Sequence, residues 1–153
     1  MNENRLEDLK DEKNLKSKEL AKIFGVHEST YSEWEHNKIP IPTKRLLQIA
    51  EFYNISIDYM LKLSNERKNI PGNVELNLEK IGHILKDIRL EMNISLRSLG
   101  KILNISFSSL GSYERGEHLI QSETLITLCK ISNYSIDYIL GRSNQKLIKK
   151  LNK

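Results

Sequence analysis

The chain has 153 residues, of which 29% are charged and 39% hydrophobic, and its formal net charge is +4. Its apolar runs fall short of the roughly 18 residues that a membrane span requires, and its first residues are charged, so we expect neither a membrane segment nor a signal peptide. A single cysteine, Cys129, excludes an internal disulfide and favours a reducing, cytoplasmic location.

The sequence repeats itself at an offset of 79 residues. Glu35 recurs as Glu114, and the run Ser56–Tyr59 recurs as Ser135–Tyr138. A repeat of this length is a whole small domain rather than one unit of a solenoid. The pattern predicts a first domain over residues 1–65, a linker over 66–79, a second domain over 80–144 and a basic tail over 145–153. We expect the tail to be frayed.

Copy one is expected to form five short helices, because its apolar residues recur three and four positions apart. Gly25 separates the second helix from the third, since glycine tolerates a left-handed turn. Pro40 and Pro42 keep the next segment extended, and Ser56 can cap the last helix. The expected inward residues are Leu6 and Leu9; Leu20, Ile23 and Phe24; Tyr31 and Trp34; Leu46, Leu47, Ile49, Ala50 and Tyr53; and Ile57, Met60 and Leu61.

Copy two repeats this order with a longer and more apolar first helix. Asn104 takes the turn position of Gly25, and asparagine is the next-best tolerated residue in a left-handed turn. No segment alternates well enough to predict a strand, so we expect an all-α protein. The inward residues are Ile81, Ile84, Leu85 and Ile88; Leu99, Ile102 and Leu103; Leu110 and Tyr113; Leu125 and Leu128; and Ile136, Ile139 and Leu140.

The second and third helices of each copy share a motif: a small residue, a turn residue and an inward aromatic residue at fixed offsets. The small residue allows the two helices to cross closely, and the turn residue joins them tightly. Copy one reads Leu15…Glu19-Leu20-Ala21…Phe24-Gly25-Val26…Thr30…Ser32…Trp34-Glu35, and copy two reads Ile94-Ser95…Leu99-Gly100…Leu103…Ile105-Ser106…Tyr113-Glu114-Arg115-Gly116. With these residues the chain resembles the Cro/phage-repressor (xenobiotic-response-element) type of helix-turn-helix regulator over nearly its whole length. The resemblance implies two tandem five-helix lambda-repressor-like DNA-binding domains.

The resemblance also implies which residues meet double-stranded DNA, because the third helix of this family enters the major groove. Base reading falls on His27, Glu28, Ser29, Thr30 and Glu33 in copy one and on Ser106, Phe107, Ser108, Ser109 and Ser112 in copy two. Phosphate contacts fall on Lys16, Ser17 and His36 in copy one and on Ser95, Arg97 and Arg115 in copy two. Two structural ion pairs are implied, Lys10 with Glu35 and Arg89 with Glu114.

The two expected reading faces differ in charge. In copy one, Glu28 and Glu33 would be repelled by phosphates and could accept a hydrogen bond only at a well-placed cytosine, so this face either reads DNA or binds protein. In copy two the serines can bond almost any base, and Phe107 can contact a thymine methyl group or pack against its own domain. Residues 81–153 carry 11 Lys/Arg against 6 Asp/Glu, whereas residues 1–65 carry 10 against 11.

We expect a sequence-specific DNA-binding transcriptional regulator, most simply a repressor, that uses the third helix of one or both copies. It would act as a homodimer through the closing helices, over residues 57–61 and 136–140, or as an intramolecular pseudo-dimer. The alternative is a protein-binding regulator, such as an antitoxin or antirepressor, whose first copy does not bind DNA. The sequence has no phosphate-cradling glycine loop, metal-ligand cluster or catalytic triad pattern, so we expect no enzyme activity, metal or cofactor.

Overall fold

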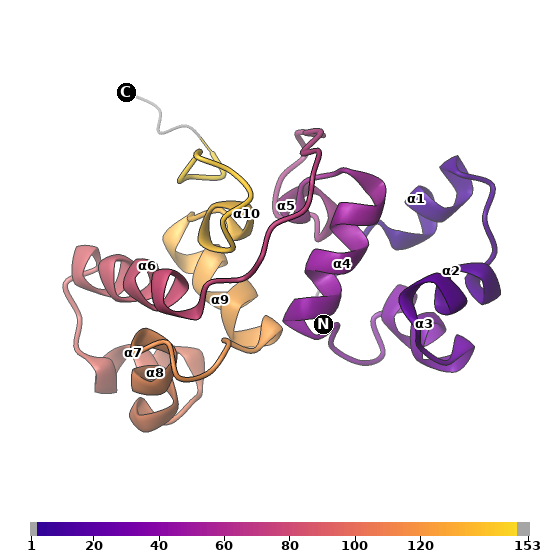
Figure 1. Cartoon of the computed structure of the whole chain (residues 1–153). Coiled ribbons are helices and arrows are strands. Elements are labelled where there is room, and N and C mark those ends of the chain that lie inside the picture. Colours follow the sequence, from indigo (N-terminus) through magenta and orange to yellow (C-terminus); the bar gives the residue numbers. More distant parts are fainter. Residues whose placement is uncertain (1–2, 150–153) are drawn as a thin grey trace. The chain divides into compact units, whose positions relative to one another are not determined.

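The computed structural model of the chain describes residues 3–149 (Figure 1). These residues form helices α1 to α10 and, apart from two isolated β-bridges, contain no strand. Within the same range, no helix is both long and apolar enough to cross a membrane. The chain divides into two compact units, Met1–Gly72 and Asn73–Lys153, and each holds five of these helices. The all-α fold with five helices per copy is therefore confirmed.

Unit 1 contains the helices of copy one. They are α1 (Leu6–Glu12), α2 (Ser17–Phe24), α3 (Glu28–Glu35), α4 (Thr43–Tyr53) and α5 (Ile57–Met60). Apolar side chains spaced three and four residues apart pack inward around Tyr31 and Leu46, which are fully buried. Helix α3 rests mainly on α2, its close neighbour in Figure 1, so one side of α3 is left exposed.

Unit 2 contains the helices of copy two. They are α6 (Leu78–Glu91), α7 (Leu96–Leu103), α8 (Phe107–Glu114), α9 (Ser122–Ser132) and α10 (Ile136–Ile139). Helix α6 is twice as long as α1, and Asn77 caps its start by accepting a hydrogen bond from the Lys80 amide at 3.0 Å. Helix α8 packs against both α6 and α7 (Figure 1), which hold it from two sides.

The turn between the second and third helix of each unit has the same left-handed backbone. Gly25 has a φ of 71° and Asn104 a φ of 58°, and each ends the preceding helix. The expectation that asparagine replaces glycine at this turn is confirmed. The caps of the closing helices also correspond, because Ser56 accepts a hydrogen bond from the Tyr59 amide and Ser135 accepts one from the Tyr138 amide.

The expectation that Ile23 and Ile102 face inward is wrong. Their side chains are 48% and 53% exposed, respectively. In α2 the inner face is formed instead by Leu20, Ala21 and Phe24, all of which are buried. Successive residues are 100° apart on a helix, so Ile23 lies well to the side of this stripe. On so short a helix the apolar spacing is compatible with two different inward faces. Because α3 packs over Ala21, the face that contains Ala21 is the one that is buried.

The segment that follows each closing helix pairs with the backbone before that helix. In unit 1 the Ser56 amide donates to Lys68 O at 3.0 Å and the Ile70 amide donates to Asn54 O at 3.0 Å, so part of the expected linker, 66–79, belongs to the unit. The other end of that linker is already helical, because α6 begins at Leu78.

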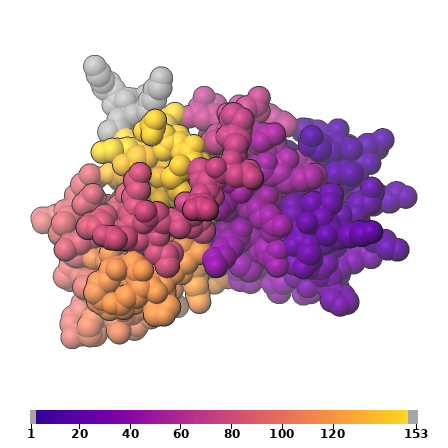
Figure 2. Space-filling view, viewed as in Figure 1, coloured from indigo at the N-terminus to yellow at the C-terminus, as the bar shows by residue number. Residues whose placement is uncertain are grey.

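Unit 2 has the same pairing after α10. The Ser135 amide donates to Lys146 O at 2.7 Å and the Ile148 amide donates to Asn133 O at 2.8 Å. In Figure 2 this segment (yellow) covers part of unit 2 beside α6. The expectation of a frayed tail is therefore wrong for residues 145–149, because backbone pairing anchors them, and residues 150–153 lie outside the described residues.

Candidate nucleic-acid interface

The close crossing of α7 and α8 fixes where the first turn of α8 points. The Ile105 amide donates to Gly100 O at 2.9 Å, and a Cβ atom at Gly100 would lie 2.9 Å from Ile105 O. Only glycine fits this contact of unit 2 without a shift of the backbone. In unit 1 the Val26 amide donates to Ala21 O at 2.9 Å, so the same junction is built with alanine.

The exposed first turn of α8 gathers the expected base-reading residues of copy two. Ser106, Phe107, Ser108 and Ser109 are all exposed, whereas Ser112, one turn later, is half-buried. The opposite side of the helix is buried. The helix therefore presents three neutral hydroxyl groups and one aromatic ring on the face left open by α6 and α7, with Ser112 at the edge of that face.

The hydroxyl groups of α8 are not equally available. Ser106 caps the helix, because its Oγ accepts from the Ser109 amide at 3.0 Å and donates to Ser109 Oγ at 2.9 Å. Ser112 Oγ donates to Ser109 O at 2.7 Å. Within the described part of the chain, the Ser108 hydroxyl has no hydrogen-bond partner. Ser108 is thus the serine of this turn whose hydroxyl can both donate to a ligand and accept from it without a competing contact within the protein.

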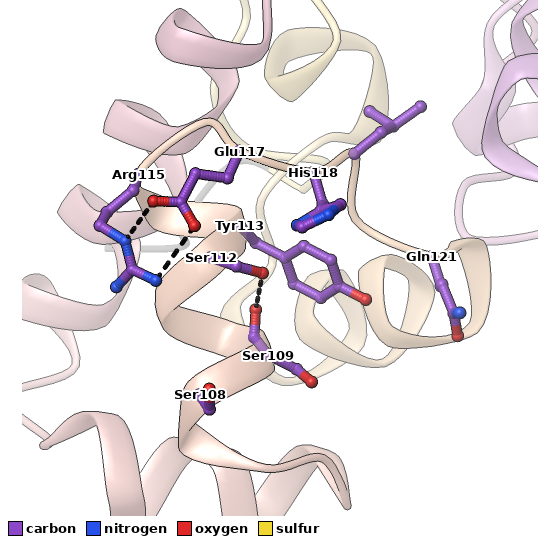
Figure 3. Close-up of a pocket in the computed structure, with 9 residues that line it drawn as sticks. Ser108, Ser109, Ser112, Tyr113, Arg115, Glu117, His118 and Gln121 are labelled. Atoms are coloured by element: carbon purple, nitrogen blue, oxygen red, sulfur yellow. Dashed lines mark hydrogen bonds and ion pairs between the residues drawn. The ribbon is translucent and has the colours of Figure 1, made fainter.

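A shallow hollow of about 510 Å³ lies beside this turn (Figure 3). Its lining combines α8 with the loop that follows it: Ser108, Ser109, Ser112, Tyr113, Arg115, Glu117, His118, Leu119 and Gln121. Sequence reasoning missed Glu117, His118 and Gln121. These residues lie in a connection without a motif, where copy one carries prolines, and their only sequence signal is that they directly follow Arg115 and Gly116.

Arg115, at the rim of the hollow, forms an exposed ion pair with Glu117. Its Nε lies 2.8 Å from Glu117 Oε2, and its Nη2 lies 3.2 Å from Glu117 Oε1 (Figure 3). These hydrogen bonds raise the pKa of Arg115 and lower the pKa of Glu117. Exposed pairs contribute little to stability, and Arg115 can exchange Glu117 for another anion at small cost.

The N-terminal turn of α7 lies next to that of α8. Ser95 caps α7 by accepting from the Ser98 amide at 3.1 Å, and its hydroxyl donates to Ser98 Oγ at 3.0 Å. Two residues further on, the guanidinium carbon of Arg97 lies 4.0 Å from the centroid of the Phe107 ring. This cation–π contact links the first turns of the two helices.

The corresponding surface of unit 1 is acidic. His27, Glu28 and Ser29 are exposed at the start of α3, and Thr30 and Glu33 are half-buried. This first turn therefore presents a carboxylate where α8 presents an aromatic ring.

The expected phosphate contacts of copy one differ in how available they are to a ligand. The hydroxyl of Ser17 lies between the Lys10 ammonium, at 3.3 Å, and the Glu35 carboxylate, at 3.4 Å. Lys16 is exposed at the start of α2, and the ring Nδ1 of His36 lies 2.8 Å from Ser32 O. Of the three residues, Lys16 and His36 are exposed and Ser17 is half-buried.

A buried glutamate in each unit joins the third helix to the first. Lys10 Nζ lies 2.7 Å from Glu35 Oε1. Arg89 binds Glu114 in a bidentate manner, with Nε–Oε2 and Nη2–Oε1 distances of 2.7 and 3.1 Å. The hydrogen bond to its glutamate raises the pKa of each base, and both pairs tie the end of α3 or α8 to the core.

The closing helices offer few apolar side chains to a second subunit. Ile57 and Met60 of α5 and Ile136 and Ile139 of α10 are all buried within their own units. Asp58 and Asp137 are buried as well, so Tyr59 and Tyr138, which are half-buried, are the residues of these two helices that a second subunit could contact.

Both copies of the repeat match a known family of proteins. A helix-turn-helix family model, HTH_3, matches residues 6–60 and again residues 85–139. The HTH-type transcriptional regulator YobD of Bacillus subtilis (strain 168), itself described as uncharacterized, is 32% identical over 72 residues. That match covers 43% of this chain and 64% of YobD, so the chain spans less than two thirds of its relative.

Two solved structures are similar to part of the chain. The clp gene regulator ClgR from Corynebacterium glutamicum is 28% identical, with 42% of this chain and 68% of that chain covered and a TM-score of 0.38. The P22 c2 repressor in complex with a synthetic operator is 27% identical, with 46% of this chain and 100% of that chain covered and a TM-score of 0.39.

Proposed function

We propose a function from the premise that the chain belongs to the HTH_3 helix-turn-helix family of DNA-binding transcriptional regulators, whose model matches both copies of the repeat. The proposed function is sequence-specific binding of double-stranded DNA, most simply as a repressor that occludes a promoter. Helix α8 of unit 2 enters the major groove and reads base edges.

The exposed and neutral first turn of α8 is the observation that carries this proposal. The Ser108 hydroxyl is free to donate to a base or accept from one, and Phe107 adds an apolar surface. Arg97, Arg115 and the capped start of α7 at Ser95 flank this turn and are suited to phosphate oxygens. Base contacts and phosphate contacts would therefore come from adjacent parts of one surface.

Unit 1 plays a different part in the proposal. Its exposed Glu28 would meet phosphate repulsion, and its Ser17 is already bound within the ion pair of Lys10. These observations favour weak DNA binding by α3, or a protein partner at its acidic face, as in an antitoxin or antirepressor. The proposal assigns DNA affinity to unit 2 and leaves unit 1 as an accessory domain.

The salt dependence of binding tests the proposal. Affinity for a retained genomic fragment should fall by about 0.9 log units per log unit of salt for each phosphate neutralised. Because Arg115 is expected to neutralise one phosphate, Arg115→Gln should reduce this slope by about 1. The control Lys62→Gln removes an exposed charge from unit 1 and should leave the slope unchanged. Absence of salt-dependent retention of any genomic fragment would contradict DNA binding altogether.

A further inference from the structure

The contact between Arg97 and Phe107 joins residues that lie ten positions apart on two helices. The guanidinium carbon lies 4.0 Å from the ring centroid, well within the range of a cation–π contact. Both side chains are exposed, and 44% of Phe107 remains accessible. The guanidinium therefore limits the movement of a ring that stays partly in solvent.

The fold itself does not require this contact. Copy one has Lys18 and Glu28 at the matching positions, and α2 and α3 still form the same turn and the same helix crossing. An aromatic ring at the first position of α8 is also unlike its neighbours Ser106 and Ser108, which are polar. The cation–π contact is not needed for folding and lies on the open face of α8, which favours a role in ligand binding.

We propose, resting on the DNA-binding function proposed above, that Phe107 is a specificity-determining residue for thymine and that Arg97 is its positioning residue. The C5 methyl of thymine is the apolar group that base pairs expose in the major groove. With the guanidinium over one face, the ring meets this methyl group with its edge or its other face. Arg97 remains close enough to the DNA surface for its charge to favour a nearby phosphate.

Replacement of single thymines by deoxyuridine tests this inference, because it removes the methyl group and leaves every hydrogen-bonding atom in place. The probe is a labelled duplex that carries the sequence selected by the intact chain. One buried methyl group corresponds to roughly a fourfold change in affinity. We expect about this loss at one thymine of the sequence that each α8 contacts and no loss at the other thymines.

Two variants separate the roles of the ring and the guanidinium. Phe107→Ala should bind the thymine and deoxyuridine duplexes equally. Arg97→Lys keeps the positive charge but loses the flat group that lies over the ring, so it should lower the thymine preference more than the overall affinity. A purely structural role of Arg97 would lower the affinity for all duplexes by the same factor.

The outcomes distinguish this inference from the function on which it rests. If the intact chain binds no DNA, both are overturned. If it binds DNA but no thymine is sensitive, or if Phe107→Ala keeps the sensitivity, the thymine contact is wrong and DNA binding stands. An unchanged thymine preference in Arg97→Lys overturns the positioning role. Far-ultraviolet circular dichroism shows that each variant is folded, as expected for exposed positions.

Discussion

At the scale of single residues, the two units differ most sharply at a buried ion pair. In unit 2, Arg142 Nη1 lies 2.6 Å from Asp137 Oδ1, and both side chains are almost fully buried. In unit 1 the matching residues are Asp58 and Leu63, so the arginine is specific to unit 2. Removal of the arginine takes away the oppositely charged partner of a carboxylate that is buried in a medium of low polarity, which is costly.

Arg142→Met should therefore destabilise unit 2 by about 3 kcal/mol. Hydrogen exchange of the α9 and α10 amides measures this loss within unit 2. Trp34, the single tryptophan, is buried in unit 1, and its fluorescence should report an unchanged unfolding transition. Arg67→Met is the matched control, because its 2.7 Å pair with Glu12 is about half exposed and should contribute at most about 1 kcal/mol. If the two substitutions lowered the free energy of unfolding by the same amount, burial would not be what makes the Arg142–Asp137 pair important.

At the scale of elements, the close approach of α6 to α8 depends on a glycine at their crossing. A Cβ atom at Gly82 would lie 2.8 Å from Tyr113 O and closer still to Glu114 O. Both are backbone atoms of the third helix, so neither can rotate away. The matching residue in copy one is Glu3, which precedes α1 and makes no such crossing.

Gly82→Ala should destabilise unit 2 by about 2 kcal/mol through this overlap. The sign of the change in unfolding free energy is informative. Alanine is the better helix former by about 1 kcal/mol, so the same substitution at a solvent-exposed helical position would stabilise the protein. Lys86→Ala, one turn later and exposed, should change stability by less than about 0.5 kcal/mol. Denaturant unfolding followed by circular dichroism measures both variants. A more stable Gly82→Ala protein would show that α6 and α8 do not approach this closely.

The sequence predicted the elements that depend on local residue types. The left-handed turns at Gly25 and Asn104 and the serine caps of α5 and α10 follow from single residues and their neighbours. The inward placement of Ile23 was wrong because an eight-residue helix offers two plausible apolar faces.

Other features depend on contacts that leave no mark in a sequence pattern. The pairing of Lys146 with Ser135 involves backbone atoms alone, so residue types do not reveal it. The Arg97–Phe107 stack and the Arg115–Glu117 pair depend on side-chain conformation, which the repeat does not specify. Position in the repeat could indicate which residues share a surface, but not which of them are already bound to one another.

At the scale of the whole molecule, one scaffold occurs twice with different exposed surfaces. The cores, turns and glutamate pairs correspond in the two units. The first turns of α3 and α8 do not, because one exposes Glu28 and the other exposes Phe107 at the matching position. Residues 81–153 also carry the basic excess of the chain. The repeat therefore preserves the fold, whereas the exposed surfaces of the two third helices have diverged.

Selection from random DNA tests this central claim most directly. The intact chain, Ser108→Ala and Glu28→Ala would be selected in parallel, and both substitutions are at exposed helical positions where alanine does not disturb folding. The account predicts that all three recover DNA motifs, that Ser108→Ala changes the motif at one position, and that Glu28→Ala recovers the motif of the intact chain. A motif altered by Glu28→Ala and unaffected by Ser108→Ala would contradict the assignment of DNA reading to unit 2.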